Sequence, residues 1–129
     1  MNRIEIINEL KKYNLDIKKY IIISGTAMVL HGIKDETPDI DISIVPEYEE
    51  ELLEDYFAVL EHTNPNGIHA YMIDDIINFG VNYYSVPSTY IEEFPVQSIE
   101  EIIKLKSMLG REKDKKDLKL LYKRLNSNI

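Results

Sequence analysis

The chain has 129 residues and no cysteine, and its formal net charge is −8 from 23 acidic and 15 basic side chains. This length suits one compact domain, which we expect to span residues 1–129. Without cysteine neither disulfides nor thiolate metal sites can form, and so acidic a chain is a poor general binder of nucleic acid. Because no apolar run approaches the roughly 20 residues that span a bilayer and the first residues are charged, we expect a cytoplasmic protein without membrane contact.

The first part of the chain predicts alternating helices and strands. Residues 2–19 have apolar side chains at helical spacing, and the β-branched run at 20–24 indicates a buried strand. Ser24 to Thr26 then forms a turn that leads into a short helix. Residues 39–45 alternate strictly between polar and apolar side chains, which is typical of a strand with one polar face.

The second part predicts a helix, further strands and two last helices. Pro46 begins a helix whose apolar stripe continues to Leu60, and a capping box and a glycine delimit the helix from Ser98 to Gly110. The remaining predictions are a turn at 63–67, strands at 68–73 and 77–86, and a helix at about 113–125. This order predicts an α+β (α/β) domain with a small central sheet flanked by helices.

Asp39 and Asp41 lie on one face of the predicted strand, about 7 Å apart along it. Aspartate has a poor strand propensity, and two neighbouring carboxylates repel each other, so a positive charge is expected beside them. Mg²⁺ or Mn²⁺ would suit, because hard cations take oxygen ligands and often share them with a substrate phosphate. The plainer alternative is a pair of solvated surface carboxylates.

The Ser24-Gly25-Thr26 turn precedes these aspartates by about a dozen residues. Gly25 would let a phosphate approach the backbone closely, and Thr26 offers a hydroxyl where the start of a helix presents free N–H groups. Alternatively, Gly25 only makes the turn and Thr26 only caps the helix. The aspartate pair that follows favours the first interpretation, because one element could bind a phosphate while the next supplies the metal.

Together these features resemble the signature of the nucleotidyltransferase superfamily, which has the DNA polymerase β type of fold. In that signature an apolar strand leads into a helix opened by Gly with Ser or Gly, and Asp-x-Asp or Asp-x-Glu follows between apolar residues. The resemblance implies a nucleotidyltransferase-like mixed sheet with C-terminal helices. It also implies that Ser24, Gly25 and Thr26 bind the triphosphate of an NTP and that Asp39 and Asp41 bind the metal and act in catalysis.

A second segment, residues 95–121, is similar to the C-terminal signature of stand-alone bacterial nucleotidyltransferases, including relatives of abortive-infection toxins. In that signature a helix bearing a lysine precedes an Arg-x-Lys-Asp-x-x-Asp run, and Lys106 and Arg111 to Asp117 fill these places. The resemblance implies that Lys106 and Arg111 contact the nucleotide and that Asp114 completes the acidic site. From the pattern alone, Lys106 either reaches the surface or points at an anion, and the later charges form a solvated face.

Many members of the superfamily carry a third carboxylate on a later strand, which usually activates the attacking hydroxyl. The best positional match in this sequence is Asn82, whose amide could bind a metal but cannot act as a base. Asp74 is an acidic alternative that could also be only a turn residue. The sequence therefore leaves the third position open.

The resemblance implies a magnesium-dependent enzyme that moves an NMP from an NTP to a hydroxyl or phosphate acceptor. The acceptor could be a protein, a tRNA or a small molecule such as an antibiotic, and a partner protein in a toxin–antitoxin or phage-defence system is implied. The rival hypothesis is a catalytically weak or inactive module of the same fold that binds nucleotide or a partner protein. The sequence leaves the NTP, the acceptor and the oligomeric state open.

Overall fold

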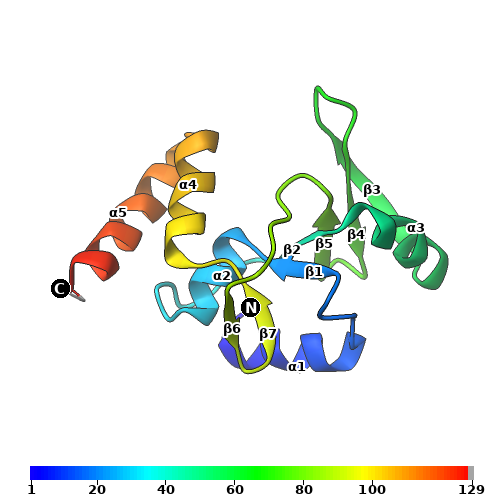
Figure 1. The fold of residues 1–129 in the computed structure, drawn as a ribbon, viewed down its shortest axis with the longest axis horizontal. Coiled ribbons are helices and arrows are strands. Elements are labelled where there is room, and N and C mark those ends of the chain that lie inside the picture. Colours follow the sequence, from blue (N-terminus) through cyan, green and yellow to red (C-terminus); the bar gives the residue numbers. More distant parts are fainter. Residues whose placement is uncertain (128–129) are drawn as a thin grey trace.

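The computed structural model describes residues 1–127 and arranges five helices around one mixed sheet of seven strands (Figure 1). The strand order across the sheet is β3-β4-β5-β2-β1-β7-β6. The expected α+β class is therefore confirmed. The helices are α1 (Arg3–Tyr13), α2 (Ser24–Leu30), α3 (Pro46–Asp55), α4 (Ile99–Leu109) and α5 (Glu112–Ser127). The strands are β1 (Tyr20–Ile22), β2 (Ile40–Ile44), β3 (Ala58–Thr63), β4 (His69–Ile73), β5 (Ile77–Gly80), β6 (Thr89–Ile91) and β7 (Phe94–Val96).

The two faces of the central strands differ in polarity. Strand β2 runs antiparallel to β1 and parallel to β5, and Ile40 pairs with Ile77 while Ile42 pairs with Phe79. These apolar side chains are buried in one core with residues of α1 and α2, so those helices cover this face. Because side chains alternate along a strand, the intervening residues point to the other face. They are Asp41, Ser43, Asn78 and Gly80.

Helices α4 and α5 border the polar face at one end of the sheet. Leu105 of α4 packs with Ile21 and Ile23 in a second, smaller apolar cluster, and Ile21 is paired with Ser43 on the polar face. In Figure 1 the two helices lie side by side next to α2, while the β3–β4 hairpin extends at the opposite end of the sheet. The polar face thus lies between the C-terminal helices at one end of the sheet and the β3–β4 hairpin at the other.

The capping signals were predicted more accurately than the lengths of the elements. The capping box of Ser98 and Glu101 and the left-handed cap at Gly110 delimit α4 as expected. The first helix was predicted too long, because Asn14 adopts a left-handed conformation and ends it at Tyr13. The helix from Pro46 ends at Asp55 rather than Leu60, because the residues after Tyr56 are extended and pair with β4.

Three strands, β3, β6 and β7, were not predicted, and one strand was predicted too long. The expected strand at 77–86 ends at Gly80, and β6 and β7 have only three residues each. Strands this short gain their stability from pairing with β1 and with each other, which a local pattern does not report. Within residues 1–127, no helix is both long and apolar enough to cross a membrane.

Candidate active site

Asp39 and Asp41 lie at the start of β2, on the polar face of the sheet, and both are partly buried. Burial and, after it, the neighbouring carboxylate of Asp39 together raise the pKa of Asp41 to about 7, although Lys113, Lys106 and Arg111 oppose the shift. Burial also raises the pKa of Asp39, and Lys113 again opposes the shift. The structure therefore holds two coupled carboxylates whose negative charge is only partly compensated.

Thr26 fixes the backbone of these aspartates. Its side chain is 0% exposed, and its hydroxyl donates to the carbonyl oxygen of Asp39 at 3.0 Å and accepts from the N–H of Asp41 at 2.9 Å. With both hydrogen bonds made inside the protein, this hydroxyl has no proton left to donate to a phosphate, and contact between Thr26 and a nucleotide stays a prediction. Thr26 couples the first turn of α2 to the start of β2.

Gly25 is required by the packing of the same turn. A Cβ atom at this position would lie 3.0 Å from the hydroxyl oxygen of Thr37, which is itself buried. Real Cβ contacts are almost never closer than this, so any larger side chain would displace Thr37 and with it the segment that leads to Asp39. The glycine thus keeps α2 close to the aspartate strand.

Ser24 connects the start of α2 to the C-terminal helices. Its N–H donates to the side-chain oxygen of the buried Gln97 at 3.0 Å, and its hydroxyl oxygen accepts from the ammonium group of Lys106 at 3.3 Å. Its φ angle is 57°, in the left-handed region that favours glycine. Such a strained residue is held in place by the surrounding contacts, and strain of this kind clusters at functional sites.

Ser24→Gly is expected to be more stable than Ser24→Ala by about 1 kcal/mol, because only glycine adopts the left-handed conformation without strain. Both variants lose the hydroxyl group, so the difference between their free energies of unfolding reports the backbone strain at this position. Urea denaturation measures it. At the exposed Ser107 inside α4 the order should reverse, since glycine destabilises a helix relative to alanine. Equal stability of the two Ser24 variants would contradict the strain.

Lys106 lies in a buried cluster of charges between α2, α4 and α5. It is 2% exposed, and its ammonium group lies 2.9 Å from Asp117 and 3.4 Å from Asp114. Lys34 also contacts Asp117, at 3.4 Å. Lys106 therefore neither reaches the surface nor stands free: it is paired with two carboxylates, and its remaining contact is the hydroxyl of Ser24.

Asp114 is tied to Arg111 as well as to Lys106. The side-chain Nε of Arg111 donates to Asp114 at 2.6 Å and its Nη2 at 3.1 Å, and the backbone N–H adds a third bond at 3.0 Å. Burial alone would raise the pKa of Asp114, but these hydrogen bonds from Arg111 lower it to about 2. Asp114 thus orients two cations, and its part in completing the acidic site stays a prediction.

The residue beside Asp41 on the neighbouring strand is Asn78, which the sequence analysis did not single out. Asn82 lies beyond the end of β5, and Asp74 is an exposed residue of the β4–β5 turn that accepts a hydrogen bond from Tyr13. Neither Asn82 nor Asp74 is paired with Asp41 in the sheet, so Asn78 becomes a further candidate for the third position. The alternation of apolar and small or polar residues in Ile77 to Gly80 was the signal that could have identified Asn78.

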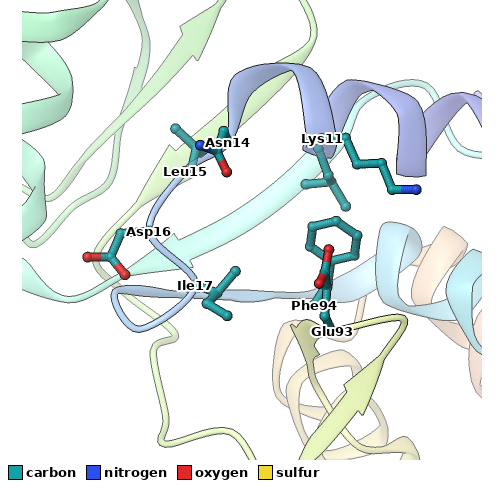
Figure 2. A pocket seen from close by; sticks show the side chains of 8 residues that line it. Lys11, Asn14, Leu15, Asp16, Ile17, Glu93 and Phe94 are labelled. Carbon is teal, nitrogen blue, oxygen red and sulfur yellow. The ribbon is translucent and has the colours of Figure 1, made fainter.

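The hollows on the described part of the protein include two of several hundred cubic ångströms, and one of these adjoins this site. It has a volume of about 570 Å³. Its lining includes Tyr83, whose N–H bonds to Ser43, and Gln97, which bonds to Ser24. The other hollow, of about 420 Å³, lies between the end of α1 and the β6–β7 turn (Figure 2). It includes none of the candidate site residues, so we do not assign it to the site.

The donor groups fit a hard divalent cation that is shared with a substrate. Asp39 and Asp41 supply carboxylate oxygens, and the raised pKa of Asp41 reflects burial first and then repulsion from Asp39, which a bound cation would relieve. Within residues 1–127 no three carboxylate or imidazole groups gather into a cluster that could hold a metal ion by itself. Mg²⁺ typically completes such a site with water and substrate phosphates.

The mixed sheet bordered by C-terminal helices has the same fold as solved structures of nucleotidyltransferases. No family model and no curated protein matches the chain in sequence.

Solved structures provide the particular comparisons. TM1012 of Thermotoga maritima, assigned as a nucleotidyltransferase, is 20% identical with a TM-score of 0.62 over 98% of this chain and 96% of its own. The antibiotic-resistance factor ANT(2'')-Ia is 17% identical with a TM-score of 0.60 over 95% of this chain and 82% of its own. The same factor in complex with adenylyl-2''-tobramycin gives a TM-score of 0.57 at 17% identity, over 95% of this chain and 87% of its own. At these identities the likeness establishes the fold.

Proposed function

We propose that this protein is a nucleotidyltransferase that moves an NMP from an NTP to an acceptor. The observation that carries the proposal is the aspartate pair on the polar face, fixed by Thr26 and faced by Lys113 and Arg111. Two close carboxylates with cations beyond them suit a nucleotide held through a divalent metal, because the metal and the cations then share the phosphate charge.

The chain's own residues would bind and orient the triphosphate. Arg111, whose side chain is 47% exposed, and the exposed Lys113 would contact the phosphates directly. Lys106 would act from its buried position by fixing Ser24 at the start of α2. Asp39 and Asp41 would hold Mg²⁺ or Mn²⁺, and the metal would supply positive charge that offsets the charge of the phosphates. An acceptor oxygen would attack the α-phosphorus while the bond to the β-phosphate oxygen breaks, and pyrophosphate would leave.

The biological setting is also a proposal. ANT(2'')-Ia was solved with an adenylylated antibiotic, tobramycin, so a small-molecule acceptor is one candidate, beside a protein or a tRNA. The segment from Lys106 to Asp117 is similar to the C-terminal signature of stand-alone bacterial nucleotidyltransferases. This similarity supports a cytoplasmic role with a partner protein in a toxin–antitoxin or phage-defence system.

Transfer of label from α-labelled NTPs, with Mg²⁺ or Mn²⁺ and cell extract, tests the proposed activity. We expect Asp39→Asn and Asp41→Asn to lower the rate by at least about 100-fold, the usual scale for losing a group that stabilises transition-state charge. Asp55→Asn removes an exposed carboxylate of α3 and is expected to leave the rate unchanged. Label on the γ-phosphate should appear only in pyrophosphate.

The second candidate function is an inactive module that binds nucleotide or a partner, and Asn78 in the third position is what favours it. The same assay separates the two functions. Binding of NTP without release of pyrophosphate, across acceptors from the whole extract, would establish the module and refute the enzyme.

A further inference from the structure

On the polar face, the row of side chains that runs from Asp41 across β5 to β4 has no ionisable member beyond Asp41 itself. Asn78 of β5 is paired with Asp41, and Met72 of β4 is paired with Asn78. Since strands in a sheet lie about 4.8 Å apart, Asn78 is the side chain nearest to Asp41 along this row. One pair further on, Gly80 lies beside Ser43 and carries no side chain at all.

This row matters because a neutral hydroxyl must lose its proton as it attacks phosphorus. A general base must lie within about 2.6 to 3.2 Å of that proton, directly or through one water. The amide of Asn78 cannot accept a proton at neutral pH, since its oxygen is only a hydrogen-bond acceptor. With Asp39 and Asp41 occupied by the metal, nothing on this row would take the proton.

The charges around the site suit a second anion instead. Arg111, whose side chain is 47% exposed, and the exposed Lys113 present two cations at the start of α5. Lys104 lines the adjoining hollow and is exposed, while the hollow's own carboxylate, Glu101, is bound by Ser85 at 2.6 Å and by the N–H of Ser98 at 3.0 Å. Burial would raise the pKa of Glu101, but these hydrogen bonds lower it.

We propose that the acceptor presents an oxyanion that is already ionised at neutral pH, a phosphate monoester or a carboxylate, rather than a neutral hydroxyl. This inference rests on the proposed nucleotidyltransferase activity. A lone pair of the acceptor oxyanion forms the new bond to the α-phosphorus, and the bond from that phosphorus to the β-phosphate oxygen breaks. Pyrophosphate leaves with the electron pair. No proton has to be removed, and the product is an anhydride of the acceptor with the NMP.

The chemical linkage of the product tests this inference without knowledge of the acceptor. Wild-type protein is incubated with α-labelled NTP, saturating Mg²⁺ and extract, and the labelled product is isolated. A product cleaved by hydroxylamine is a mixed anhydride with a carboxylate, and one cleaved by a pyrophosphatase is an anhydride with a phosphate. A phosphodiester resists both reagents and is opened by a phosphodiesterase. We expect one of the two anhydrides.

Asn78→Asp supplies the missing base, and Asn78→Ala is its matched control. With glycerol as a hydroxyl acceptor, Asn78→Asp is expected to raise the ratio of phosphodiester to anhydride at least about tenfold, toward the 100-fold or more of general base catalysis. Asn78→Ala removes the amide without adding a base, so the ratio should not rise. Thermal melting of both variants checks that they fold, and saturating Mg²⁺ removes differences in metal occupancy.

Different results would contradict the acceptor inference and the proposed transferase activity. A phosphodiester from the wild-type protein, or an equal ratio in all three proteins, would overturn the acceptor inference while leaving the transferase activity intact. Absence of any transfer by the wild type and by Asn78→Asp, despite NTP binding, would overturn the proposed function and the inference with it.

Discussion

Lys106→Ala is expected to lower the free energy of unfolding by about 3 kcal/mol, because removing one partner of a buried ion pair leaves the other without compensation. Asp114 is 0% exposed and Asp117 is 7% exposed, and both contact the ammonium group of Lys106. In this variant Arg111 still contacts Asp114 and Lys34 still contacts Asp117. The expected loss of stability is therefore at the lower end of the range for broken buried ion pairs. Chemical denaturation followed by circular dichroism measures it.

Two further variants separate charge from packing. Lys106→Met with Asp117→Asn removes the cation and one carboxylate together, so it should recover part of the stability that the single variant loses. Lys104→Ala lies on the same helix with an exposed side chain and should change stability by no more than about 0.5 kcal/mol. If Lys106→Ala were as stable as Lys104→Ala, the cluster would not be what holds α4 against α2 and α5.

The elements that could be predicted from the sequence are those whose signals are local. The capping box at Ser98 and the left-handed glycine at 110 act within one turn, and they set the ends of α4. The alternation after Asp39 acts within five residues. By contrast, the end of α3 depends on β4, which pairs with the residues after Tyr56 from further along the chain. Pairing partners decide such boundaries, and helical spacing of apolar residues does not reveal them.

In the candidate site, too, the features set by a local pattern could be predicted, and those set by tertiary packing could not. Asp39 and Asp41 share a face because a strand alternates, and Asn78 could have been found by applying that rule to β5. The role of Thr26 could not, because its hydroxyl bonds to the backbone of β2, and only the approach of α2 to that strand provides these partners. Likewise, the pairing of Lys106 with Asp117 joins two helices whose relative position depends on tertiary packing.

The partly compensated charge at Asp41 leads to a prediction on pH. A raised pKa means that the folded protein binds a proton that the unfolded chain has already released, so stability falls as pH rises from about 4 to about 7. Asp41→Asn cannot lose this proton. It should match the wild type near pH 4 and become more stable by on the order of 3 kcal/mol above pH 7. Urea denaturation of both proteins from pH 4 to pH 8, without divalent metal, measures the difference.

Adding Mg²⁺ and nucleotide should reverse this order at pH 8. A ligand that binds only the folded state stabilises it by RT ln(1 + L/Kd), where L is the free ligand concentration, and the ionised pair of Asp39 and Asp41 is the form that binds the metal. The wild type should therefore gain stability and Asp41→Asn should not, while Asp55→Asn should gain as much as the wild type. A gain of equal size in Asp41→Asn would place the metal elsewhere. Ionised Asp41 would then destabilise the metal-free protein without contributing to metal binding. Metal binding would no longer explain why the two carboxylates lie side by side.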